Sequence, residues 1–291
     1  MNNLKKYLFL SIISLAIISC EDDSIPVANN VTLAFNNTFG NTTIVLGDAT
    51  STEATQNTSS ENQVHHFSEA KYIISNIRLI NKDGIEFPYN VNNLDTGATI
   101  IDQSNPSTLQ YVLNGIPSTE YTQIKFGLGV KAALNTLDQE LFPAFYSADK
   151  KLHWFWATGY RFTKIEGFYG ETNTPLSVHT GSVLGGDKTD ETTWSSEAAH
   201  ARNAYRDITL DLTTNAKVGE NAPKINIKAD FNKVLSGTNK ITLNAATEGY
   251  VSGSAPSHHT SPETMVQFVD NMGGNGDTDI TGMFSIESVE N

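Results

Sequence analysis

The stretch Lys224-Ile225-Asn226-Ile227-Lys228-Ala229-Asp230-Phe231 has an apolar side chain at every second position. Strict alternation of this kind predicts a β-strand that buries one face and exposes the other. Val31 to Phe35 has the same period, and the turn residues Gly40-Asn41 followed by Thr43 to Leu46 predict a hairpin. Further strands are predicted at residues 71–80, 121–130, 152–166, 240–243 and 283–289, the third of them around Gly159. The whole pattern indicates roughly eight to ten strands.

The composition favours strands over a helical bundle. Hydrophobic residues make up 38% and charged residues only 18% of the 291 residues, while Asn and Thr are abundant. One helix is predicted after Ser261, which can act as its N-cap, and its apolar face would hold Met265, Phe268, Val269 and Met272. The predicted fold is therefore all-β: an antiparallel β-sandwich in one domain over residues 31–291, with long inserted loops and a short C-terminal helix. The polar stretch 48–63 lacks apolar periodicity and is predicted to be a disordered loop.

Charge and cysteine content exclude several functions. The chain has 32 acidic residues against 19 Lys and Arg, so its formal net charge is −13, which opposes binding to the phosphate backbone of nucleic acids. Cys20 is the only cysteine, which excludes an intrachain disulfide and a cysteine-based zinc cluster. Phosphate-binding loops, nucleophile elbows and zincin motifs are absent from the sequence, and we expect no enzymatic activity.

The first residues have the order of a lipoprotein signal. Lys5 and Lys6 precede the apolar run Tyr7 to Ile18, which is too short to span a bilayer, and Ser19-Cys20 follows as a small-residue cleavage position. Because Ile17-Ile18-Ser19-Cys20 resembles a bacterial lipobox, we expect residues 1–19 to be removed and Cys20 to be lipidated, with residues 20–30 as a tether. Removal of the two lysines would make the net charge −15. The expected location is extracytoplasmic, on the outer membrane; the acidic residues Glu21-Asp22-Asp23 slightly favour its cell-surface face over its periplasmic face.

Several segments together resemble one family. The segments that carry the resemblance are Lys71 to Leu79, Gly127 to Val130, Leu152-His153-Trp154-Phe155-Trp156-Ala157-Thr158-Gly159-Tyr160, Lys164-Ile165-Glu166-Gly167 and Val178-His179-Thr180-Gly181. In this order they resemble the MbnP-like copper-binding proteins, as a Bacteroidetes-type lipoprotein member, over about residues 31 to 289. The resemblance implies a secreted β-sandwich with a copper site. In some relatives it also implies a tryptophan oxidised to kynurenine and a di-haem partner of the peroxidase type. Two positions depart from the family pattern: Asn37, where many relatives carry His, and Lys131, where Asp is common.

Histidines supply the candidate copper ligands. Imidazole suits copper, and a site needs two or three such ligands that converge in space. The family match makes His179 the leading candidate. Glu166 is either a carboxylate that orients the ring of a metal-binding histidine or a surface glutamate beside a turn glycine. His65 and His66 lie at the entrance to the strand predicted at 71–80. Adjacent residues of a strand point to opposite faces, so we expect at most one of the two to join His179 as a ligand. His258 and His259 lie in a Gly/Ser/Pro-rich segment and are either ligands or parts of a solvated loop.

The tryptophans leave two functions open. Trp154 and Trp156 are predicted to share one strand face, where they either pack in the core or include the oxidised position. Exposed on the surface, the same pair would instead form the platform of a carbohydrate- or protein-binding module without metal. Burial of the two rings would favour the copper interpretation.

Overall fold

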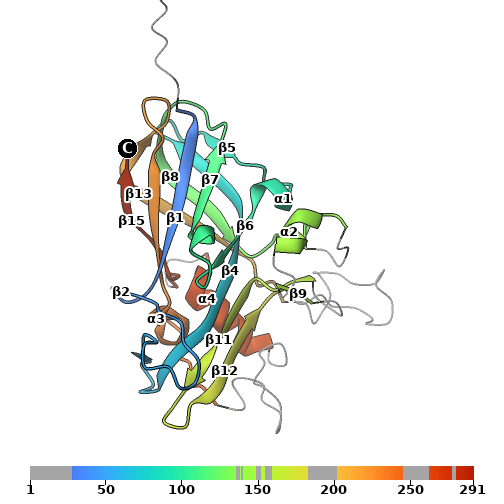
Figure 1. The fold of residues 1–291 in the computed structure, drawn as a ribbon. Coiled ribbons are helices and arrows are strands. Elements are labelled where there is room, and N and C mark those ends of the chain that lie inside the picture. The colour runs from blue at the N-terminus through green and yellow to red at the C-terminus, as the bar shows by residue number, and fades with distance from the viewer. Residues whose placement is uncertain are drawn as a thin grey trace, which may run out of the picture.

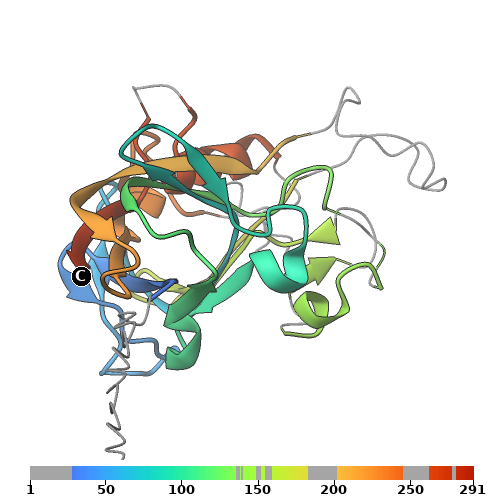
Figure 2. The same cartoon turned by 90° about the horizontal axis from the view of Figure 1, so that it is seen from above.

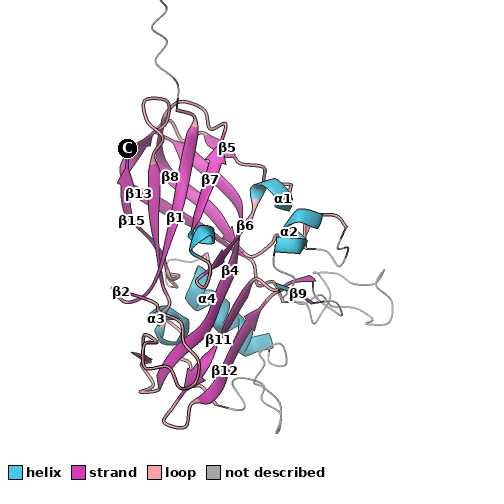
Figure 3. Cartoon of the chain, in the orientation of Figure 1, coloured by secondary structure: helices cyan, strands magenta, loops and turns pink. Residues whose placement is uncertain are grey.

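The computed structural model describes residues 28–135, 138, 140–148, 152–154, 159–182, 202–244, 262–276 and 280–291. Strands dominate it (Figure 3). The predicted signal peptide and Cys20 lie outside the described residues. Within the described part of the chain, no helix has both the length and the apolar character to cross a membrane.

Two large sheets form a β-sandwich, which confirms the predicted all-β class (Figure 1). One sheet has the order β15-β14-β1-β2, with β7 also paired to β1, and the other has the order β12-β11-β4-β8-β13, with β3, β5 and β6 also paired to β4. The strands of the first sheet are β1 (Asn30–Phe39), β2 (Thr42–Thr43), β7 (Gln110–Asn114), β14 (Lys224–Asp230) and β15 (Phe284–Glu290). Those of the second are β3 (Asn57–Thr58), β4 (Val64–Asn81), β5 (Glu86–Pro88), β6 (Thr99–Asp102), β8 (Glu120–Leu128), β11 (Thr163–Tyr169), β12 (Thr174–Thr180) and β13 (Arg206–Lys217). All pairings between these strands are antiparallel except that of β1 with β14.

The core lies between the inner faces of the two sheets. The alternating residues of β1 and β14 point inward as the sequence predicts, and Phe35 packs its ring against Tyr72 of β4 and Phe126 of β8. Phe126 in turn contacts Phe284 of β15. Each large side chain buried in this way stabilises the fold by about 1.5–3 kcal/mol. The view from above shows the strands closing around this interior (Figure 2).

The long strand β4 changes partners along its length, and this positions the candidate site. Its first half pairs with β11, and its second half pairs with β8. The exchange takes place near Asn76, where a register irregularity coincides with a positive φ of 50°. Asparagine tolerates this left-handed conformation better than most residues, and its side-chain amide donates a hydrogen bond to the Tyr205 hydroxyl at 2.7 Å. As a result, β11 and β12 extend the sheet beyond the sandwich (Figure 1).

Helices are few and short. They are α1 (Leu94–Gly97), the 3₁₀ turn η1 (Pro106–Leu109), α2 (Pro143–Ala148), α3 (Asn232–Ser236) and α4 (Pro262–Gly273). The predicted C-terminal helix is confirmed as α4, whose four predicted apolar residues are all fully buried. Its cap Ser261 lies outside the described residues.

Three predictions about elements are wrong. The stretch 152–166 is not one strand: β9 (His153–Trp154) pairs antiparallel with β10 (Gly159–Tyr160), so the chain reverses before β11 begins. Residues 240–243 form only an isolated bridge at Lys240, because the backbone of Leu243 bonds to the side chain of Gln63 instead of a strand. The loop 48–63 is not disordered.

Side-chain hydrogen bonds hold the loop 48–63 in place. Asn57 donates to the Asn232 side chain at 2.9 Å, and the backbone of Ser60 donates to the Ser236 hydroxyl at 2.9 Å. Gln63 exchanges two hydrogen bonds with the backbone of Leu243. The loop is therefore ordered by hydrogen bonds of its polar residues. A search of the sequence for apolar periodicity cannot detect such hydrogen bonds.

Candidate functional site

His179 lies on β12, one residue before the strand ends, with only 9% of its surface exposed. Its Nε2 is 2.6 Å from Oε1 of Glu166 on the neighbouring strand β11. The Ser177 hydroxyl lies 3.3 Å from the same ring nitrogen. The structure therefore brings Glu166, a candidate for orienting a histidine ring, to His179, and β11 and β12 set the geometry of this pair.

Glu166 is held in its ionised form. Burial alone would raise the pKa of its carboxyl group, but the hydrogen bond and charge of His179, together with the charge of Lys164, outweigh burial and lower that pKa below 4.5. Lys164 lies 3.8 Å from the carboxylate. The ionised carboxylate, 2.6 Å from Nε2 of His179, accepts a hydrogen bond from the histidine ring.

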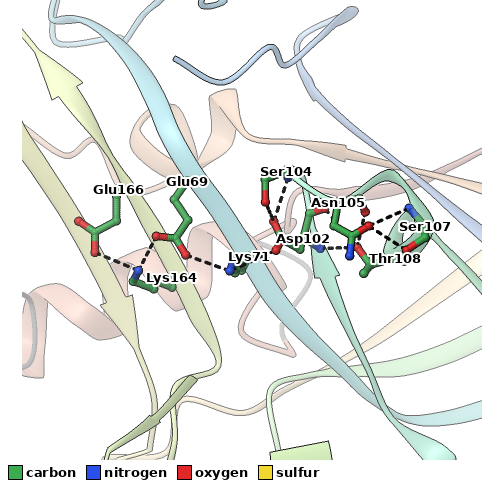
Figure 4. Close-up of polar contacts among 9 residues, drawn as sticks. All are labelled: Glu69, Lys71, Asp102, Ser104, Asn105, Ser107, Thr108, Lys164 and Glu166. Carbon is green, nitrogen blue, oxygen red and sulfur yellow. Dashed lines mark hydrogen bonds and ion pairs between the residues drawn. The ribbon is translucent and has the colours of Figure 1, made fainter. Parts of the chain in front are cut away.

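Glu166 is also one end of an ionic ladder that crosses three strands, defined here as Glu166, Lys164, Glu69, Lys71 and Asp102. Figure 4 shows Lys164 between Glu166 and Glu69, and Lys71 between Glu69 and Asp102. Lys71 lies 3.2 Å from Glu69 and 3.1 Å from Asp102, and Lys164 also contacts Glu69. Side chains in the ladder are 10–29% exposed, so solvent screens them only in part.

The register explains why the ladder runs diagonally. Lys164 is directly opposite Lys71, and Glu166 is directly opposite Glu69, so the directly opposed pairs carry like charges. Lys164 therefore reaches Glu69 diagonally across the two strands, which long side chains allow. On the other side of β4, Lys71 is directly opposite its partner Asp102 on β6. The intervening residues Ala70 and Ile165 point to the opposite face and are fully buried in the core.

The second ring nitrogen of His179 fits the needs of a metal ligand. A neutral ring that donates its Nε2–H to the Glu166 carboxylate carries its lone pair on Nδ1. Nδ1 is buried and has no hydrogen-bond partner among the described residues. Metal-binding histidines usually donate their other N–H to a carboxylate or carbonyl, and this arrangement is found here.

Comparison with known proteins identifies the family. The family model described as MbnP matches residues 28–256. The chain belongs to the MbnP family. The solved structure of MbnP from Methylosinus trichosporium superposes with a TM-score of 0.52 and 11% sequence identity, over 89% of this chain and 98% of that chain, and shows the same fold. No curated protein sequence matches.

In this MbnP-family protein, His65 and His66 do not join His179. The two histidines lie on opposite sides of β11: His66 on β4 is opposite Phe168, and His179 on β12 is opposite Lys164. Phe168 and Lys164 are four residues apart on β11. Four residues of a strand span about 13 Å, too far for two ligands of one ion. The predicted combination of His179 with one of these two histidines is therefore not formed in the structure.

His65 and His66 have structural partners of their own. The Nδ1 of His65 lies 3.1 Å from the carbonyl of Gln63, and its Nε2 lies 3.4 Å from the amide nitrogen of Asn57. Burial lowers the pKa of His65, opposed by the bond to Gln63, so its neutral form is favoured. His66 bonds through Nε2 to the carbonyl of Asp48 at 3.0 Å.

The remaining candidates are only partly described. Trp154 pairs with Gly159 where β9 meets β10, and the shared strand face predicted for Trp154 and Trp156 stays a prediction. Trp156, His258 and His259 lie outside the described residues, as does the side chain of Trp154. Among the residues that are described, no three His, Cys, Asp or Glu side chains are grouped closely enough to hold a metal ion.

Asn37, one of the two positions that depart from the family pattern described above, has a structural role. Its side chain is 1% exposed, donates to Gln103 at 2.9 Å and accepts from the Tyr72 hydroxyl at 2.7 Å. Both ends of the amide are therefore used between the two sheets. This position supplies no metal ligand in the present chain.

The ladder residues Glu69, Lys71 and Asp102 are the part of the site that sequence reasoning missed. Their signal was present, because Glu69-x-Lys71 and Lys164-x-Glu166 each place opposite charges on one face of a strand. Recognising it required knowing that these two strands are neighbours, which the sequence alone does not show.

Proposed function

We propose that this MbnP-family protein binds copper outside the cytoplasm, with His179 as a ligand through Nδ1 and Glu166 as the residue that orients its ring. The observation that carries the proposal is the buried, unpartnered Nδ1 of a histidine whose Nε2 bonds to an ionised carboxylate. Family membership supports copper as the metal. The other ligands would come from the candidates that the structure does not describe, among them His258, His259 and an oxidised Trp154 or Trp156.

In this proposal the protein binds copper and does not itself catalyse a reaction. The lipobox-like sequence supports attachment to the outer membrane through lipidated Cys20. A di-haem partner of the peroxidase type would carry out the tryptophan oxidation, so mass spectrometry of protein from the native host is the suitable test of that modification.

Metal titration with matched variants tests the copper site. Isothermal titration with Cu(I) and Cu(II) should show stoichiometric binding that His179→Gln weakens at least 100-fold, because glutamine can still bond to Glu166 but offers no imidazole. His66→Gln is the control, as His66 is a buried histidine of the same sheet that lies far from His179. Equal affinity in wild type and His179→Gln would refute the assignment of His179.

A second candidate function rests on a groove at the far end of β4 and β11. The groove has a volume of about 440 Å³, and its lining combines amide side chains with aromatic rings. Among the lining residues are Gln56, Asn62, Asn173, Phe168 and Tyr169. Amides that donate and accept, next to aromatic faces, suit a neutral saccharide. A glycan array decides this reading: saccharide binding that Asn62→Ala removes and chelators leave unchanged would favour it.

A further inference from the structure

A cavity lies at the end of the sandwich where the described chain begins. It has a volume of about 420 Å³, and its polar lining consists of Lys82, Ser118, Thr119, Glu120, Lys217 and Glu220. Gly219 also lines it and forms a two-bond bridge with Ala28, with distances of 3.3 and 2.8 Å. In Figure 1 this is the upper end, where β1 starts and where the mark C lies.

The cavity carries charges of both signs that do not satisfy one another. Lys82 and Lys217 form no ion pair among the described residues, and neither does Glu220 or Glu120. Glu120 only accepts an amide hydrogen bond from Asn215 at 3.1 Å. Four lysines elsewhere in the described residues do pair with carboxylates: Lys71, Lys125, Lys164 and Lys224. The two ammonium groups and two carboxylates of the cavity are therefore available to a ligand.

These groups match a ligand that carries both charges. A phosphate would bind to the two lysines and to the hydroxyl groups of Ser118 and Thr119, through charge-assisted hydrogen bonds. A nearby ammonium group on the same ligand would meet Glu120 and Glu220. A purely anionic ligand would face these two carboxylates without compensation, and the net charge of −13 would repel an anionic surface as a whole.

We propose that the cavity binds the zwitterionic phosphoethanolamine headgroup of a membrane lipid. The choice of a membrane lipid rests on the lipidation of Cys20 proposed above. Cys20 precedes Ala28 by eight residues, and eight extended residues span at most about 28 Å, so an anchor at Cys20 would hold this end of the sandwich close to the bilayer surface. The headgroup contact would orient the domain on the membrane, with the extended part of β11 and β12 directed away from it.

Water-soluble headgroups separate this proposal from the anchor. Titration of the exported protein with glycerophosphoethanolamine, followed by NMR, should show saturable binding at least 10-fold tighter than that of glycerophosphoglycerol, which has no ammonium group. The double substitution Lys82→Met and Lys217→Met should weaken it at least 10-fold. Lys131→Met is the control, because Lys131 is exposed, has no side-chain partner among the described residues, and lies beyond the opposite end of β8.

Three results would overturn the proposal: absence of saturable binding, equal binding of the two headgroups, or equal binding by the double variant with a native circular dichroism spectrum. None of them depends on Cys20. Loss of membrane fractionation in Cys20→Ala tests the anchor separately, so failure of one proposal is distinguishable from failure of the other.

Discussion

Two histidine regions on one sheet differ in how the ring nitrogens are used. At His65 both nitrogens have partners, a backbone carbonyl and an amide, and the ring also contacts Phe39 and Phe67. At His179 one nitrogen bonds to a carboxylate and the other has no partner among the described residues. Both rings are buried, so burial alone does not distinguish a structural histidine from a candidate ligand. The hydrogen-bond partners do.

The largest expected effect concerns the structural histidine. His65→Ala should lower the free energy of unfolding by about 3 kcal/mol, because it leaves a cavity beside the packed rings of Phe39 and Phe67. His179→Ala should lower it by about 1 kcal/mol or less, since the ring lies at the end of β12. Urea unfolding of both variants measures the difference. Similar losses in the two variants would remove the structural distinction between the regions.

A smaller effect is expected in the ladder beside His179. Lys164→Met leaves Glu69 and Glu166 without their shared cation, and we expect a loss of about 2 kcal/mol, below the 3–5 kcal/mol typical of fully buried pairs because the ladder is partly solvated. Lys131→Met should change the unfolding free energy by about 0.5 kcal/mol or less. If both substitutions have the same small effect, solvent screens the ladder fully and it does not stabilise the site.

Sequence periodicity predicted the sandwich well and the site only in part. The alternating residues of β1 and β14 and the apolar face of α4 were recognisable because burial imposes a period of two or 3.6 on the chain. The strand β13 was missed, since its buried residues alternate over only part of Arg206–Lys217. In the site, Glu166 was a candidate for orienting an imidazole, but its contact with His179 follows from the pairing of β11 with β12, which the sequence did not show.

The separation of His66 from His179 could not be predicted from the sequence. Both residues lie on strands next to β11, and only the register shows that they meet it four residues apart. The same holds for β9 and β10. An aromatic-rich stretch around Gly159 is compatible with one strand or with a hairpin, and the pairing of Trp154 with Gly159 is a tertiary choice.

The carboxylate of Glu166 offers a sharper test of the ligand region. Glu166→Gln should lower copper affinity by about 10-fold to 100-fold, as is usual for the partner of a metal-bound histidine. The unfolding free energy should change by about 1 kcal/mol or less, because the amide is nearly isosteric. Titration with copper and urea unfolding give the two values. A loss of stability without a loss of copper affinity would show that Glu166 stabilises the fold and does not orient a metal ligand.

The smallest expected effect is the pH dependence of the structural region. Burial lowers the pKa of His65 below its ordinary value of 6.5, so between these two pKa values the unfolded state binds more protons than the folded state. The stability contribution of neutral His65 is therefore complete above about pH 6.5 and is lost as the pH falls from there toward the folded pKa. His65→Phe keeps an aromatic ring beside Phe39 and Phe67 but does not titrate, so its unfolding free energy should fall less steeply below pH 6.5 than that of the wild type. Urea unfolding at several pH values from 7.5 downward, with His179→Gln in parallel, measures the slopes. If the slope of His65→Phe equals that of the wild type, protonation of His65 is not linked to unfolding, and the contrast between the two histidines would then rest on hydrogen-bond geometry alone.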